Sequence, residues 1–251
     1  MSDPYADPWV FLREKTPARI ALGRCGDGLP TARLLEFQRD HARARDAVHA
    51  ALDSEKLCSE LDPLKPIIVQ SQARDRALYL QRPDLGRRLD EASREKLREG
   101  FYDISLVLAD GLSALAVQSQ AARLGALIEK RLPLRFAPPV IALQARVALG
   151  DEIASALGAR LVIVLIGERP GLSAADSLGA YITFAPVPGK TTDAQRNCIS
   201  NIRPGGLSLE EAARRIGAIA SYALHLQGTG TMLKEDAALN ALAPPEAMKE
   251  R

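Results

Sequence analysis

The chain has 251 residues, 47% of them hydrophobic and 25% charged, so it can bury a substantial core as one domain or as a domain with an appendage. This composition excludes a disordered or fibrous protein. The 33 Lys and Arg residues nearly balance the 31 Asp and Glu residues, so no net field favours binding to nucleic acid or to an anionic membrane.

The start of the chain and its cysteines bear on localisation. No run of about 18 apolar residues occurs, and the first ten residues (MSDPYADPWV) lack the basic start and apolar stretch of a signal peptide. We therefore expect a cytoplasmic protein that makes no membrane contact. Cys25, Cys58 and Cys198 are far apart and form no Cys-x-x-Cys pair, so neither a disulfide framework nor a metal site is expected.

Residues 1–95 are predicted to form an arm followed by a mainly helical region. Residues 1 to about 30 show little periodicity and several turn residues, which is typical of an extended arm. From Thr31, apolar residues recur at helical spacing and predict an amphipathic helix. A short strand at Ile67 to Val69 follows. The Arg-rich segment 74–88 is either a solvated helix broken at a proline or a docking surface for a larger partner, and its periodicity does not decide between them.

Residues 96–251 alternate apolar runs with helical stretches, which predicts a Rossmann-like parallel α/β sheet with helices on both faces. Capping residues indicate where two of the helices begin, because Ser113 and Ser208 can each accept a hydrogen bond from the first turn, and Glu211 would complete a capping box with Ser208. The predicted elements, in chain order, are a strand at Ile104 to Ala109, a helix from Ser113 through Leu127, a strand at Val140 to Leu143, a helix at Asp151 to Leu157 stopped by Gly158, strands at Ala159 to Ile166 and Ala180 to Phe184, and a helix from Ser208 to about Gln227.

Three predicted loops would leave the carboxyl ends of these strands, where parallel sheets bind ligands. They are Asp110-Gly111, Gly167 to Gly171, and Asn197 to Gly206. The second loop places Glu168 beside Arg169, either as an ion-paired turn that only closes the strand or as part of a ligand site.

No catalytic set assembles from the sequence. The three histidines, His41, His49 and His225, fall in predicted helices with no Ser or Cys nucleophile nearby. The turn after the strand at Ile104 to Ala109 reads DGLSALA and lacks Gly-x-Gly-x-x-Gly, and no P-loop motif occurs. Binding of NAD, FAD or a P-loop nucleotide is therefore not expected.

Several segments resemble one known family in the same order along the chain. They are TPARIALGR, FQRDHARARDAVH, YLQRPDLGRRL, DISLVLADGLSA, ARVALGDEI, LGARLVIVLIGERPGLSAADSLGAYITFAP and RNCISNIRPGGLS. Together they cover most of residues 16 to 232 and are similar to the small subunit, or light chain, of ethanolamine ammonia-lyase. The pairing of GERPGL with NCISNI is far more specific than any single glycine motif.

The resemblance implies a function that composition does not show. In this family a large catalytic subunit converts ethanolamine to acetaldehyde and ammonia by radical chemistry that starts with homolysis of the cobalt–carbon bond of adenosylcobalamin. The small subunit closes over the cofactor at the shared interface. The resemblance thus implies a hetero-oligomer in which residues 1–95 dock on the large subunit and residues 96–251 contact cobalamin, with the catalytic residues on the partner.

Three cofactor contacts carry over from the family by position: Val147 in ARVALGD, Glu168 in GERPG and Cys198 in NCISNI. Val147 would supply an apolar contact to the corrin and Glu168 would accept from an amide N–H. Cys198 is expected to pack against the ligand rather than to ligate cobalt.

Two departures from the family pattern matter. Ala145 stands where the family usually has Gly, and the short N-terminus leaves packaging in a bacterial microcompartment open as an alternative to the free cytoplasm. The competing interpretation is a non-catalytic binding or scaffold module that keeps the fold without the cofactor.

Overall fold

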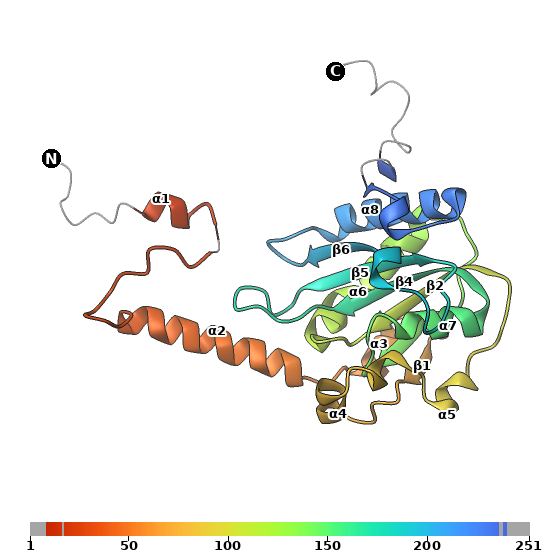
Figure 1. Cartoon of the computed structure of the whole chain (residues 1–251), viewed down its shortest axis with the longest axis horizontal. Helices are drawn as coiled ribbons and strands as arrows, with labels where there is room; N and C mark the ends of the chain where they lie inside the picture. Colours follow the sequence, from red (N-terminus) through yellow and green to blue (C-terminus); the bar gives the residue numbers. More distant parts are fainter. Residues whose placement is uncertain (1–8, 17, 236–237, 240–251) are drawn as a thin grey trace, which may run out of the picture.

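A computed structural model describes residues 9–16, 18–235 and 238–239 of the chain. Its architecture is a six-stranded sheet with helices on both faces, preceded by a helical N-terminal region (Figure 1). The strands are β1 (Ile67–Gln70), β2 (Tyr102–Ala109), β3 (Val140–Leu143), β4 (Ala159–Gly167), β5 (Leu178–Phe184) and β6 (Asn197–Ile202). The α-helices are α1 (Val10–Arg13), α2 (Thr31–His49), α3 (Ser54–Glu60), α4 (Arg76–Gln81), α5 (Glu91–Arg94), α6 (Ala114–Arg131), α7 (Leu149–Leu157) and α8 (Leu209–Leu226), with 3-10 turns at Leu85–Arg87, Asp193–Gln195 and Gly230–Met232.

The sheet is mixed, with strand order β1-β3-β2-β4-β5-β6. The first four strands in this order pair in parallel, as predicted, but β5 runs antiparallel to β4 and β6 antiparallel to β5. The prediction of a parallel Rossmann-like sheet is therefore wrong in direction for β5, and it included no strand at β6. The physical reason is the connection, because parallel neighbours need a crossover, usually a helix, and no helix lies between β4 and β5.

Side chains alternate across β2 and β4 and fill two separate cores. On one face, Leu106 and Ile163 pack with α3, α6 and α8, and on the other face Val107 and Val164 pack with α7. Both strands are buried almost throughout, which matches the continuous apolar runs that predicted them.

The predicted helix boundaries in this part are largely confirmed. The Ser113 hydroxyl accepts from Ala116 N at 3.4 Å and the Ser208 hydroxyl from Glu211 N at 3.2 Å, so both serines cap their helices. The Glu211 carboxylate accepts instead from Arg214 and Arg215, which means that only the first half of the expected capping box forms. Gly158 ends α7 in the left-handed conformation, as its position predicted.

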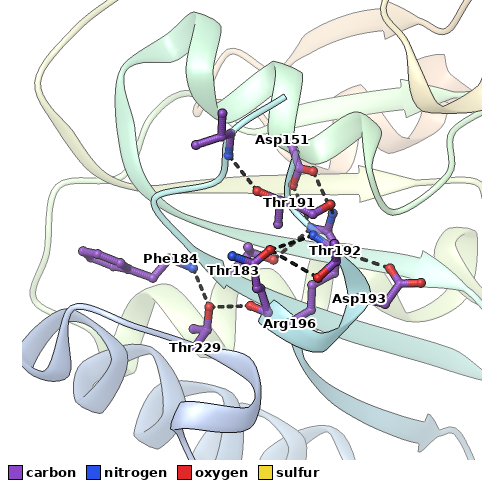
Figure 2. Close-up of polar contacts among 10 residues, drawn as sticks. Asp151, Thr183, Phe184, Thr191, Thr192, Asp193, Arg196 and Thr229 are labelled. Atoms are coloured by element: carbon purple, nitrogen blue, oxygen red, sulfur yellow. Dashed lines mark hydrogen bonds and ion pairs between the residues drawn. The ribbon is translucent and has the colours of Figure 1, made fainter. Parts of the chain in front are cut away.

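A buried ion pair fixes the antiparallel edge to the rest of the fold (Figure 2). Arg196, just before β6, donates from both terminal guanidinium nitrogens to the carboxylate of Asp151 in the first turn of α7, each at 2.7 Å. Arg196 also donates to the Thr183 hydroxyl of β5 at 3.1 Å. Nearby, the Thr229 hydroxyl accepts from Phe184 N at 3.0 Å and donates to the Gln195 carbonyl at 2.7 Å. One cluster thus joins β5, β6, α7 and the segment after α8.

The N-terminal region differs from a purely extended arm. A short helix, α1, interrupts it, while residues 1–8 and 17 of the predicted arm lie outside the described residues. The predicted helix from Thr31 is present as α2, but Ala47 is its one buried residue, and Figure 1 shows α2 extending away from the sheet. In the Arg-rich segment, α4 ends before Pro83, yet its Tyr79 is completely buried, so this helix is anchored rather than simply solvated.

Candidate functional site

A cavity of about 440 Å³ opens where β2 and β4 end. Its walls come from turns after the parallel strands, from the two antiparallel strands and from α4. The lining residues are Tyr79, Gly111, Leu112, Arg146, Val147, Ile166, Gly167, Glu168, Arg169, Tyr181 and Ser200. The predicted loops at Asp110-Gly111 and Gly167 to Gly171 meet at this site, and the third predicted segment, Asn197 to Gly206, reaches it through Ser200.

Glycines make the close approach of these two turns possible. Gly111 has a φ of +56° and Leu112 N donates to the Gly167 carbonyl at 2.9 Å. A Cβ atom on Gly111 would collide with the Gly167 backbone, and one on Gly167 would collide with the Ser113 backbone. The end of β2 and the end of β4 are thereby held together at the cavity.

Asp110, the residue after β2, connects this end of the sheet to the segment that carries Val147. Its buried carboxylate accepts from Gln144 N at 2.8 Å and from Ala145 N at 2.9 Å, directly after β3. Burial raises the pKa of Asp110 above its usual range, and these two N–H donors oppose the rise. Ala145, which stands where the family usually has Gly, is completely buried, and the hydrogen bond from its N–H to Asp110 fixes its position.

Tyr79 lies between two arginines at the side of the cavity. The guanidinium carbon of Arg146 lies 4.2 Å from the ring centroid and that of Arg76 lies 4.8 Å from it, distances typical of cation–π contacts. The Tyr79 hydroxyl donates to the Ala145 carbonyl at 3.2 Å. Burial raises the pKa of Tyr79 to about 12.

The raised pKa predicts a specific pH dependence for Tyr79→Phe. An unfolded tyrosine ionises near pH 10, so the stabilisation from the protonated buried phenol is complete below about pH 10 and is lost as the pH rises through about 12. We expect the stability difference between wild type and Tyr79→Phe to shrink by roughly 1 kcal/mol between about pH 9 and pH 11. Urea denaturation of both proteins at the two pH values measures it, and a constant difference would contradict the assignment.

Glu168 is held by three donors from the antiparallel strands and the residue before them. Its Oε2 accepts from the Ser177 hydroxyl at 2.6 Å and from Asn201 N at 3.2 Å, while its Oε1 accepts from the Ser200 hydroxyl at 2.6 Å. Glu168 therefore takes its partners from the strands rather than from Arg169, which excludes the interpretation as a simple ion-paired turn. The carboxylate is presented at the cavity wall in a fixed orientation.

Cys198 lies beside the cavity rather than in its lining. It faces Tyr181 across the β5–β6 pair, and Tyr181 does line the cavity. Although the Cys198 residue is exposed, partial burial of its thiol raises its pKa, nearby Glu168 raises it further, and the Tyr181 hydroxyl opposes the rise. The sulfur is thus a neutral thiol at physiological pH.

The structure brings Val147 and Glu168 together in one cavity and places Cys198 directly opposite the lining residue Tyr181 in the β5–β6 pair. The predicted loop at Asn197 to Gly206 is wrong in its first part, because Asn197–Ile202 forms β6 and Ser200 reaches the cavity from that strand. The sequence of β6 resembles a loop because polar residues exposed on this outer strand, such as Ser200 and Asn201, interrupt its apolar residues.

Sequence reasoning missed Tyr79, Arg146 and Tyr181 as lining residues. For Tyr181 the alternation within β5 was an available indication, since it is half-buried among buried neighbours. For Tyr79 and Arg146 no local pattern exists, because they meet only after β1 and β3 pair.

The described residues contain neither a metal-binding cluster nor a membrane-spanning helix. No group of three or more His, Cys, Asp and Glu side chains there is arranged to hold a metal ion. No helix in the described ranges is long and apolar enough to cross a membrane.

Comparison with known proteins gives one family. The family model for "Ethanolamine ammonia-lyase light chain (EutC)" matches residues 6–234. The chain is 50% identical to the ethanolamine ammonia-lyase small subunit of Bradyrhizobium diazoefficiens over 95% of each chain. It is 53% identical to that of Rhodopseudomonas palustris (92% of this chain, 91% of the relative) and 47% identical to that of Rhodococcus erythropolis (98% and 96%). The chain therefore belongs to the family of ethanolamine ammonia-lyase light chains.

Proposed function

We propose that this small subunit forms one wall of an adenosylcobalamin site, and that a large subunit completes the site and converts ethanolamine to acetaldehyde and ammonia. The observation that carries the proposal is the meeting of Val147 and Glu168 in a single cavity at the carboxyl ends of β2 and β4. These two residues are separated along the chain and come from different turns, so their meeting is a consequence of the fold.

The residues of the cavity fit a corrin. Leu112, Val147 and Ile166 offer an aliphatic surface, and Glu168 offers a carboxylate acceptor, which suits a broad apolar ring fringed with amides. A corrin is larger than this cavity, so the cavity would hold one edge of it, with Cys198 at the margin. Bound adenosylcobalamin would supply the radical that begins the reaction.

The chain's own residues would bind and orient the cofactor. Val147 packs against the ring, Glu168 accepts a hydrogen bond from a side-chain amide, and Tyr181 with Cys198 covers the margin. In this proposal the chain itself contributes no catalytic residue. The groups that bind ethanolamine would then belong to the large subunit.

A surface for the large subunit lies on the N-terminal region. We call Trp9, Val10, Phe11, Leu29, Leu34, Leu35 and Phe37, all exposed large hydrophobic residues, the N-terminal apolar surface. Isolated helices are marginally stable in water, and α2 buries only Ala47 against its own chain. Large hydrophobic side chains that their own chain leaves exposed are typical of an interaction site, and we propose that the N-terminal apolar surface docks on the large subunit.

Glu168→Ala tests the site directly. We expect this change to weaken adenosylcobalamin binding to the assembled complex by about 1 to 3 kcal/mol, the cost of leaving a polar partner unpaired. Titration of the complex with the coenzyme, followed by its visible absorption, measures the effect. The matched control is Glu95→Ala, a change of an exposed glutamate that does not line the cavity.

Two results would decide against the proposal. Equal coenzyme affinity of wild type and Glu168→Ala would remove Glu168 from the site. A large subunit that binds coenzyme and deaminates ethanolamine equally well without this chain would instead favour the scaffold function.

A further inference from the structure

We propose that Glu168 makes this site selective for a neutral primary amide over a carboxylate, and that Ser177 and Ser200 are positioning residues that hold Glu168 for this task. The inference rests on the proposed function, because it assigns the ligand chemistry of one position in the same site. It goes beyond a simple contact by stating which groups the position rejects.

The hydrogen bonds of Glu168 leave acceptor capacity on one oxygen. A carboxylate offers about four acceptor sites, two on each oxygen. Oε2 accepts from Ser177 and Asn201 N, whereas Oε1 accepts from Ser200. Because Glu168 and Ser200 both line the cavity, the unused acceptor site of Oε1 is available to a ligand donor there.

The surroundings prevent Glu168 from turning away from an unsuitable ligand. Glu168 N donates to the Ser177 carbonyl at 2.9 Å, so backbone and side chain are tied to the same residue. Ser177 is buried, and Gly179 leaves space that a side chain would take, since a Cβ there would lie 3.0 Å from Oε1. The carboxylate is therefore a rigid acceptor that a ligand must match.

Because the Glu168 carboxylate cannot move, it discriminates between ligand groups that donate a hydrogen bond and groups that only accept one. An amide N–H donates to Oε1, whereas a ligand carboxylate would place acceptor against acceptor and negative charge against negative charge. Arg146 and Arg169 also line the cavity, so a ligand carboxylate at another position would meet a cation instead. The rejection is consequently expected at the position beside Glu168 and not around the whole ligand.

The experiment uses adenosylcobalamin and a series of analogues in which one side-chain amide at a time is hydrolysed to a carboxylate. Each is titrated into the assembled complex of this chain and the large subunit, and affinity is read from visible absorption. For wild type we expect at least one analogue to bind about 100-fold more weakly than the coenzyme. In Glu168→Gln, which can donate as well as accept, the difference for that same analogue should fall below about 10-fold.

The positioning role of the serines is tested by the same ratio, the affinity for adenosylcobalamin divided by the affinity for the analogue. Ser200→Ala should reduce the discrimination, and Ser200→Thr, which keeps a hydroxyl, should restore it. Ser200 is exposed, so its replacement tests the inference even where the buried Ser177→Ala fails to assemble. A merely structural serine would lower the affinities for coenzyme and analogues by the same factor.

The outcomes separate the inference from the proposed function. If wild type binds adenosylcobalamin but treats all analogues alike, or if Glu168→Gln keeps the wild-type pattern, the selectivity is overturned and the cofactor site stands. The positioning role is overturned if Ser200→Ala leaves the discrimination unchanged. If the wild-type complex binds no adenosylcobalamin, the proposed function fails and the inference fails with it.

Discussion

Replacement of Arg196 by methionine should lower the free energy of unfolding by about 3 to 5 kcal/mol, because it leaves Asp151 as an unpaired buried charge. Both side chains of the pair are only 2% exposed, so water screens the loss little. The position of Asp151 in the first turn of α7 offsets part of the cost, since the helix dipole stabilises a negative charge there by about 0.3 to 1 kcal/mol. Urea denaturation of the isolated subunit measures the change.

Two matched variants show whether charge or shape is responsible. Arg196→Lys keeps the charge but loses the two-pronged contact, so it should lose less stability than Arg196→Met. The double variant Asp151→Ala with Arg196→Met removes both charges and should be more stable than Arg196→Met alone. If the double variant were the less stable of the two, the unpaired carboxylate would not be the cause of the loss.

Replacement of Leu34, Leu35 and Phe37 by serine should weaken assembly with the large subunit by at least about 100-fold, the effect expected when central apolar residues of an interface are lost. These residues belong to the N-terminal apolar surface and are 42%, 58% and 40% exposed, so the sheet should fold normally without them. Figure 1 shows why, since α2 stands apart from the layers that contain the core. Sedimentation of mixed subunits measures the affinity.

A control for this surface is Phe101→Ser. Phe101 is 86% exposed and lies just before β2, at the end of the strand opposite the cavity. It should leave assembly intact. Equal assembly of the triple serine variant and wild type would contradict docking through α2.

The central part of the fold could be predicted because its information is local. The continuous apolar runs of β2 and β4 and the caps at Ser113 and Ser208 depend on neighbouring residues, and the structure has them where the sequence predicts them. Strand direction was less accessible. For β5 it depended on recognising that no α-helix lies between β4 and β5, and the segment of β6 was predicted as a loop.

Polar pairs between residues far apart in the chain could not be predicted from the sequence. Arg196 and Asp151 are 45 residues apart, and Ser200 and Glu168 are 32 residues apart, so neither pair follows a helical or strand repeat. The site residues Val147, Glu168 and Cys198 came from family resemblance. What the fold adds is the cavity that Val147 and Glu168 share and the hydrogen bonds that orient Glu168.

The visible absorption of cobalamin that remains bound after gel filtration tests the shared site most directly. Large subunit alone, and large subunit assembled with this chain, are each incubated with adenosylcobalamin and separated from free coenzyme. We expect the assembled complex to retain the coenzyme colour and the large subunit alone to lose it. A colourless complex, or a large subunit that holds the coenzyme equally well by itself, would contradict a cofactor site formed by both chains.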